Sequence, residues 1–193
     1  MYVAIEGVDK TGKTTLWQTI SIEFGITGKD LLFERIREPS YFFTLPSFCK
    51  GSPKEKEIQA LSFAKDRLRN YELAIQAKKG PLFLLSDRSK FSSFAYQGED
   101  VYPYNMMINK HMPDPDIVIY LYADWDLIEP LFDKDDIFEE KSLLEKAHEM
   151  YLGPIRQYCL RNNIEFVTFD SRDEEVFPQN VLDYLNEKLE VKE

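Results

Sequence analysis

Residues 7–14 read Gly-Val-Asp-Lys-Thr-Gly-Lys-Thr and match every fixed position of the phosphate-binding loop pattern G-x-x-x-x-G-K-[ST]. The β-branched and aromatic residues at positions 2–5 predict a buried parallel strand before the loop, and the apolar spacing from Thr14 to Phe24 predicts a helix after it. In this setting the loop N–H groups converge on phosphate oxygens, and the helix N-terminus adds partial positive charge. The motif therefore predicts that the chain binds a nucleoside triphosphate. Lys13 is expected to bridge the β- and γ-phosphates, and the Thr14 hydroxyl to ligate Mg²⁺.

Short apolar segments alternate with helical patterns along the rest of the chain. Alternation of this kind predicts an α/β protein, with a five-stranded parallel sheet flanked by helices on both faces in three layers, here the P-loop kinase fold. We expect residues 1–193 to form one domain, because no linker or repeat interrupts the pattern. Further strands are expected at 31–36, 82–85, 117–121 and 165–169, and further helices at 53–79, at 138–162 with an interruption at Gly153-Pro154, and at 174–189.

The overall charge restricts the classes of partner. The net charge is −10, so the chain has no basic surplus to displace counterions from a nucleic-acid backbone, and we expect no nucleic-acid partner. A small phosphorylated ligand remains compatible, because it needs only a few placed cations. No apolar run approaches membrane-spanning length, and the first predicted strand begins at residue 2, so we expect no membrane association and a cytoplasmic location.

Two further groups are placed to read a second ligand. Asp87-Arg88 follows a predicted buried strand, so its side chains are expected at the same sheet edge as the phosphate loop. The Asp could hold Mg²⁺ through water and the Arg could grip a second phosphate, although a solvated ion pair is the simpler alternative. Phe63 and Arg67 are one helical turn apart and could stack on a base and bind its edge, although without further context a core position is the better interpretation of Phe63.

Four blocks occur together in the chain. They are 6–15 (EGVDKTGKTT), Arg37-Glu38-Pro39, 63–67 (FAKDR) and 86–98 (SDRSKFSSFAYQG). In this order and spacing, and with Pro115-Asp116 before the fourth strand, the chain resembles the thymidylate kinase family from residue 2 to about residue 122. The resemblance implies transfer of the γ-phosphoryl group of ATP to dTMP, giving dTDP and ADP, with Mg²⁺ as cofactor and a homodimer as the assembly.

The resemblance also implies residue roles. Asp9 would contact the sugar 3′-hydroxyl, and Arg88 would hold the acceptor phosphate. Phe63 would stack on thymine, Arg67 would reach a base carbonyl, and Ser93 would face the N3 edge. Tyr96 would crowd the C2′ position and favour deoxyribose, while Glu38, Pro39 and Gln97 would line the same pocket. The ATP side would comprise Gly7, Lys10, Thr11, Gly12, Lys13, Thr14 and Thr15, the metal would be held by Thr14 and Asp87, and phosphoryl transfer would rely on Lys10, Lys13 and Arg88.

The chain departs from the family pattern at two places. The Gly-rich sequence that follows Arg-Glu-Pro in the family is replaced by residues 40–45 (SYFFTL). The expected lid, at about 124–142, lacks the family's arginines, and no arginine occurs between Arg88 and Arg156. Lys10 stands where one branch of the family carries a catalytic arginine, so we expect it to supply transition-state charge, with Lys134 as a second candidate. The alternative is that Lys10 simply faces solvent.

Other functions remain open on the sequence alone. Asp87-Arg88-Ser89 is also similar to a motif of deoxynucleoside kinases, which would need a carboxylate base such as Glu38 beside a 5′-hydroxyl. A GTP-driven switch is disfavoured, because 109–112 (NKHM) lacks the Asp of the guanine signature. The arginine-free lid also allows a catalytically weak relative kept for nucleotide binding.

Overall fold

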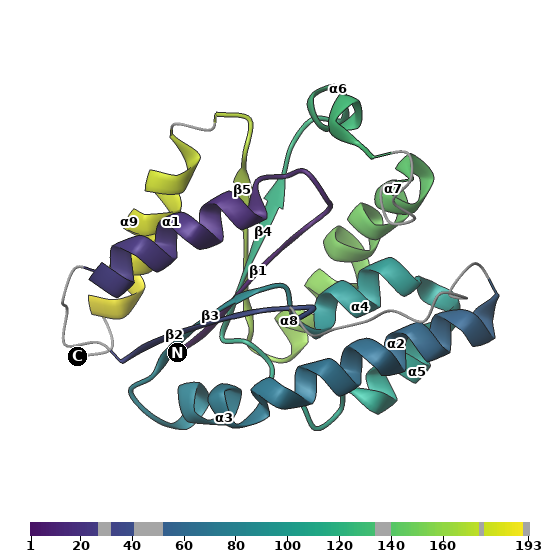
Figure 1. The fold of residues 1–193 in the computed structure, drawn as a ribbon, viewed down its shortest axis with the longest axis horizontal. Coiled ribbons are helices and arrows are strands. Elements are labelled where there is room, and N and C mark those ends of the chain that lie inside the picture. The colour runs from purple at the N-terminus through teal and green to yellow at the C-terminus, as the bar shows by residue number, and fades with distance from the viewer. Residues whose placement is uncertain (27–31, 41–51, 134–139, 174–175, 191–193) are drawn as a thin grey trace.

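The computed structural model describes residues 1–26, 32–40, 52–133, 140–173 and 176–190 (Figure 1). Its sheet is parallel throughout, with the order β2-β3-β1-β4-β5, which confirms the predicted five-stranded architecture. The strands are β1 Tyr2–Gly7, β2 Phe33–Arg37, β3 Phe83–Asp87, β4 Ile117–Tyr122 and β5 Glu165–Asp170. The chain leaves β1 at the point where strand order reverses, which is where ligands bind in open α/β sheets.

Helices cover both faces of the sheet (Figure 1). On one face lie α1 Lys13–Ile26 and α9 Phe177–Glu190. On the other face lie α3 Tyr71–Lys79, α4 Lys90–Gln97, α7 Lys141–Met150 and α8 Arg156–Arg161, with α2 Pro53–Arg67 and α5 Tyr102–Ile108 packed against α4. The short α6 Trp125–Ile128 follows β4, and single turns occur at η1 Leu68–Asn70, η2 Glu99–Val101, η3 Glu129–Leu131 and η4 Tyr151–Ile155. No helix in the described ranges has both the length and the apolar character to span a bilayer.

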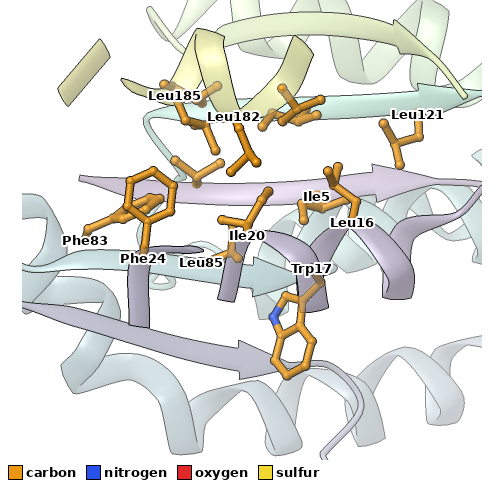
Figure 2. Packing of buried hydrophobic residues seen from close by; sticks show 14 of the residues in the cluster. Ile5, Leu16, Trp17, Ile20, Phe24, Phe83, Leu85, Leu121, Leu182 and Leu185 are labelled. Carbon is orange, nitrogen blue, oxygen red and sulfur yellow. The ribbon is translucent and has the colours of Figure 1, made fainter. Parts of the chain in front are cut away.

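Alternation along β1 sends its side chains to two different cores. Val3 and Ile5 point to the α1/α9 face, where they meet Leu16, Ile20 and Leu185 (Figure 2). The neighbouring positions Tyr2 and Glu6 therefore face the other side. That side is built on β4 and the helices around α4 and α7, and it includes fully buried Tyr120 and Tyr151.

Two predicted helices are interrupted. The helix expected over 53–79 is divided into α2 and α3 by η1, at whose end Asn70 leaves helical geometry (φ −98°, ψ 4°). Asn is a weak helix former, because its side chain competes for backbone hydrogen bonds. In the second helix, α7 and α8 are separated by η4, a π-helical turn that contains Pro154, which has no N–H to donate. The strand expected at 31–36 runs over 33–37. Three parts of the expected elements lie outside the described residues: residue 31 of this strand, residues 138–139 of the helix expected over 138–162, and residues 174–175 of the helix expected over 174–189.

Candidate active site

The loop between β1 and α1 has a backbone that excludes side chains at two glycines. Gly7 has φ +149°, and a Cβ there would lie 2.6 Å from the backbone oxygen of Leu121 on the adjacent strand. Gly12 has φ +80°, and a Cβ there would lie 3.3 Å from Phe177 Cζ. Both positions therefore require glycine, for steric and conformational reasons. The predicted strand, loop and helix are all present, and the loop occupies the carboxyl edge of the sheet.

Lys13 begins α1 and is almost fully buried. Its Nζ donates to the Val8 carbonyl at 2.5 Å and lies 3.7 Å from Asp9 Oδ1, while the Thr11 hydroxyl donates to the same carbonyl at 2.8 Å. Burial, together with the nearby Arg88 charge, lowers the pKa of Lys13 to about 8, against the opposing effect of Asp9. The Lys13 ammonium is thus held by its own loop. A bound phosphate would raise the Lys13 pKa, because a nearby negative charge favours the protonated form.

This environment predicts the pH dependence of ATP use. The Lys13 pKa is about 8 in the enzyme without bound nucleotide. Because kcat/KM reports the protonation state of the free enzyme, kcat/KM for ATP should fall about tenfold per pH unit above that pKa. At saturating ATP the profile of kcat should stay flatter, since bound phosphates raise the Lys13 pKa. Initial rates between pH 7 and 10 test this, with Lys13→Arg as the control whose cation does not titrate. A kcat/KM that stays level to pH 9.5 would contradict the prediction.

The remaining loop cations and hydroxyls are less buried. Lys10 is exposed, in the left-handed region at φ +66°, and its charge helps to lower the pKa of Asp9. Thr14 is half-buried and Thr15 is exposed on the first turn of α1. Lys134, the second candidate cation, lies outside the described residues. The structure thus places Lys10 beside Asp9 at the outer rim of the loop.

Asp9, Arg88 and Tyr96 come together from three elements. The Arg88 guanidinium forms an ion pair with Asp9 Oδ1, and the Tyr96 hydroxyl donates to Asp9 Oδ2 at 3.1 Å. The Arg88 Cζ lies 5.1 Å from the centre of the Tyr96 ring. Burial acts to raise the pKa of Asp9, but Arg88 and Lys13 outweigh it and hold that pKa below its usual value. An ionised carboxylate, a guanidinium and an aromatic ring therefore share one corner beside the phosphate loop.

Arg67 is the centre of a second, deeper cluster. Its Nε donates to Glu38 Oε2 at 2.6 Å, and its Nη1 donates to Asn109 Oδ1 at 2.6 Å. Its Nη2 donates to the Ser89 carbonyl at 3.2 Å and to the Ser93 hydroxyl at 3.3 Å. Only 3% of Arg67 and 5% of Glu38 is exposed. Burial raises the pKa of Glu38 to about 7, although Arg67 opposes the shift.

The rest of the predicted acceptor pocket surrounds this cluster. Phe63 lies one turn before Arg67 on α2 and is partly exposed, and Pro39 follows Glu38 through a cis peptide bond. Gln97 is buried and donates to Gln59 Oε1 at 3.1 Å, while its own Oε1 has no hydrogen-bond partner among the described residues. Ser40 anchors the segment after Pro39, because its N–H and hydroxyl donate to Asp66 at 2.7 and 2.6 Å. Residues 41–45 of the divergent loop lie outside the described residues.

The two expected metal ligands are Asp87, the last residue of β3, and Thr14, in the first turn of α1. Asp87 ends β3 opposite Ile5, and its charge acts on Lys13, the residue before Thr14. The Arg37 Nε lies 3.4 Å from Asp87 Oδ2. Within the described ranges no three acidic, His or Cys side chains form a metal cage. One carboxylate and one hydroxyl nevertheless fit Mg²⁺, which is usually bound by one or two carboxylates together with substrate phosphates and water.

Three further residues contact members of this site and carry no predicted role in the sequence: Asn109, Arg37 and Glu6, which accepts a hydrogen bond from the Ser89 hydroxyl at 2.6 Å. Asn109 binds Arg67 from 42 positions away, so only tertiary structure brings the two together. Arg37 could be expected from the alignment of β2 with β3, since it pairs in register with Asp87. Glu6 carries the clearest signal, because it is an acidic residue at the end of an otherwise apolar strand.

A parallel sheet of this order, with a G-x-x-x-x-G-K-T loop leading from β1 into α1, places the chain among the P-loop kinases. The family model described as thymidylate kinase matches residues 5–167. The chain therefore belongs to the thymidylate kinase family, whose members are phosphotransferases that act on a nucleoside monophosphate.

Individual relatives agree with this assignment. A probable thymidylate kinase of Methanosphaera stadtmanae is 35% identical over 166 residues, which is 81% of this chain and 84% of that protein. Probable thymidylate kinase 1 of Saccharolobus solfataricus is 32% identical over 160 residues, or 81% of this chain and 84% of that protein. The structure of a thymidylate kinase from Candida albicans superimposes with a TM-score of 0.70 over 96% of this chain and 91% of that one; at 17% identity it supports the fold.

Proposed function

We propose that this chain transfers the γ-phosphoryl group of ATP to dTMP, giving dTDP and ADP. The observation that carries the proposal is the Asp9–Arg88–Tyr96 cluster beside the phosphate loop. A guanidinium suits an acceptor phosphate, and Asp9 can accept a hydrogen bond from a sugar hydroxyl. The Tyr96 ring beside them limits the space around the sugar and favours deoxyribose.

The two nucleotides would occupy opposite sides of this cluster. On the ATP side, the backbone of the loop, Lys13 and the hydroxyls of Thr11, Thr14 and Thr15 would hold the triphosphate. On the acceptor side, Phe63 would stack on the base and Arg67 and Ser93 would read its edge, in a pocket lined by Glu38, Pro39 and Gln97. Arg88 would then present the acceptor phosphate toward the γ-phosphoryl group.

Mg²⁺ would be held by Thr14 and, through water, by Asp87, and when bound it neutralises charge on the β- and γ-phosphates. The acceptor oxygen of a monophosphate is ionised at neutral pH, so the reaction needs no general base. Positioning and charge neutralisation by Lys13, Arg88 and Lys10 supply the acceleration. A deoxynucleoside acceptor would instead need a base such as Glu38, whose Oε2 is bound by Arg67 Nε at 2.6 Å and whose Oε1 has no hydrogen-bond partner among the described residues.

A coupled ADP-release assay tests the acceptor. Thymidine, dTMP, dUMP, dCMP, dGMP and dAMP are supplied in turn with ATP and Mg²⁺. We expect ADP release with dTMP to exceed that with every other acceptor, and only background release with thymidine. Preference for thymidine would indicate a deoxynucleoside kinase, and binding of dTMP without turnover would indicate a catalytically weak relative.

Lys10 gives a further prediction. If its ammonium stabilises the transition state in place of lid arginines, Lys10→Ala should lower kcat about a hundredfold with less than about a threefold rise in KM for ATP. Lys10→Arg should retain activity, because its fork offers more hydrogen bonds than an ammonium. Lys54→Ala on the outer surface of α2 is the control for loss of one positive charge. Equal turnover in Lys10→Ala and the wild type would show that Lys10 only faces solvent.

The chain is further proposed to act as a single domain over 1–193, in the cytoplasm and as a homodimer, with a lid at about 124–142. Support for the dimer comes from the family alone, and sedimentation velocity at several protein concentrations tests it. Of the lid, the structure describes α6, η3 and the start of α7, and residues 134–139 lie outside the described residues.

A further inference from the structure

Glu6, the last residue before the phosphate loop, is fully buried and accepts hydrogen bonds from three hydroxyl groups. Ser89 donates to Glu6 Oε1 at 2.6 Å. Ser92 and Tyr151 donate to Glu6 Oε2 at 2.6 and 2.7 Å. Both carboxylate oxygens are therefore engaged, and none of these contacts has a role in the nucleotide sites described above.

The hydroxyls that meet on Glu6 also fix the turn that carries Arg88. Arg88 has a left-handed backbone (φ +74°), which a non-glycine residue adopts only when its surroundings hold it. On one side of it, the Ser86 hydroxyl donates to the Arg88 carbonyl. On the other side, Ser89 caps α4 by accepting from Phe91 N while it donates to Glu6. Glu6 thus anchors the strained turn to the strand that leads into the phosphate loop.

A second connection reaches the Arg88 side chain itself. Arg88 Nη1 donates to the Ser92 hydroxyl at 3.2 Å, and Ser92 donates onward to Glu6. The Tyr151 hydroxyl lies 3.0 Å from the Ser92 hydroxyl, and because each gives its single hydrogen to Glu6 Oε2, the two are joined through that carboxylate oxygen. The side chain that would grip the acceptor phosphate is therefore braced through Ser92 by Glu6 and Tyr151.

Tyr151 comes from a distant part of the chain. It is the first residue of the π-helical turn η4, and its ring packs against Tyr120 with a centroid distance of 4.9 Å. π-Helical turns are rare in proteins, and those that occur are often found at functional sites. Here the turn lies between α7 and α8 and places the Tyr151 hydroxyl on Glu6 Oε2, the oxygen that Ser92 also contacts.

We propose that Glu6, Ser92 and Tyr151 form a positioning triad that orients Arg88 for the acceptor phosphate, so that its loss weakens the acceptor site selectively. This inference rests on the proposed function, in which Arg88 binds the dTMP phosphate. The ATP side should be little affected, because the triad contacts Arg88 and not the loop N–H groups or the Thr14 hydroxyl.

Tyr151→Phe and Ser92→Ala test the triad by calorimetric titration with dTMP and, separately, with ADP. Ser92→Ala removes the hydrogen bond to Arg88, and Tyr151→Phe removes one of the two donors that share Glu6 Oε2. We therefore expect dTMP affinity to fall about five- to tenfold and ADP affinity to change less than about twofold. Tyr158→Phe is the matched control. It also removes a tyrosine hydroxyl that donates to a carboxylate, Asp114 at 3.2 Å, on the adjacent helix α8.

If the triad only stabilised the fold, its variants would have a lower unfolding temperature and would lose affinity for dTMP and ADP to the same extent. Unchanged dTMP affinity in both variants, or equal losses for dTMP and ADP, would overturn the inference while leaving the proposed function intact. A wild-type protein that fails to bind dTMP would instead overturn the proposed function. Because binding is measured directly, the two failures are distinguishable.

Discussion

Arg88→Met is expected to lower kcat/KM for dTMP about a thousandfold. Nucleotide binding on the ATP side, measured as ADP affinity, should be far less affected. The Arg88 side chain contacts Asp9, the Tyr96 ring and Ser92. Its loss removes the fork that would hold the acceptor phosphate, while Lys13 Nζ still lies 3.7 Å from Asp9 Oδ1. Steady-state rates with dTMP varied at saturating ATP measure the effect, and ADP affinity of the same variant measures the ATP side.

The choice of methionine matters for this experiment. Position 88 has φ +74°, and arginine and methionine bear the same backbone strain there, so a difference in stability would report lost contacts alone. Arg88→Lys keeps the charge but loses the planar fork, so it should recover only part of the activity. If Arg88→Met kept KM and kcat for dTMP within about threefold of the wild type, Arg88 would not be the acceptor-phosphate residue.

Local patterns in the sequence were sufficient for the parts of this fold that depend on neighbouring residues. The strand before Gly7, the loop and the helix from Lys13 are each encoded within a few positions, and a parallel sheet follows from the alternation of strands and helices. The interruptions at Asn70 and Pro154 show the limit of such patterns. A helical period continues through both, whereas the α-helical hydrogen-bond pattern gives way to a 3₁₀ turn at η1 and to a π-helical turn at η4.

The candidate site was only partly predictable, because its side chains are organised by partners that are distant in sequence. Arg67 could be placed on a helix face, but its partners Glu38 and Asn109 are 29 and 42 positions away. Glu6 and Tyr151 are separated by 145 positions and meet only because β1 and η4 pack on the same side of the sheet. Tertiary contacts of this kind leave no periodic signal in a single sequence.

The ion pair between Arg67 and Glu38 sets the largest expected effect on stability. Arg67→Met should lower the free energy of unfolding by about 3–5 kcal/mol at pH 8, because it leaves a carboxylate buried without its cation. The loss should grow with pH. The pKa of Glu38 is raised from 4.5 to about 7 in the folded protein, so the folded state holds more protons and its stability falls as pH rises between these values. Removing Arg67 removes an effect that lowers this pKa, so the penalty extends to higher pH.

Denaturant unfolding of the wild type and of Arg67→Met at pH 5 and pH 8 measures this difference, which should be smaller at pH 5 by about 1 kcal/mol. The double variant Arg67→Met with Glu38→Met should regain most of the loss, because replacing both members of a buried pair by apolar residues is often neutral.

Lys56→Met, which breaks the partly exposed pair with Asp100 at 3.0 Å, should cost only about 0.2–1 kcal/mol. Equal destabilisation by the single and double variants, independent of pH, would mean that Arg67 stabilises the fold through packing. Recovery in the double variant would instead show that Arg67 stabilises the fold by neutralising the buried Glu38 carboxylate, and that the fold does not need Arg67 once this charge is absent.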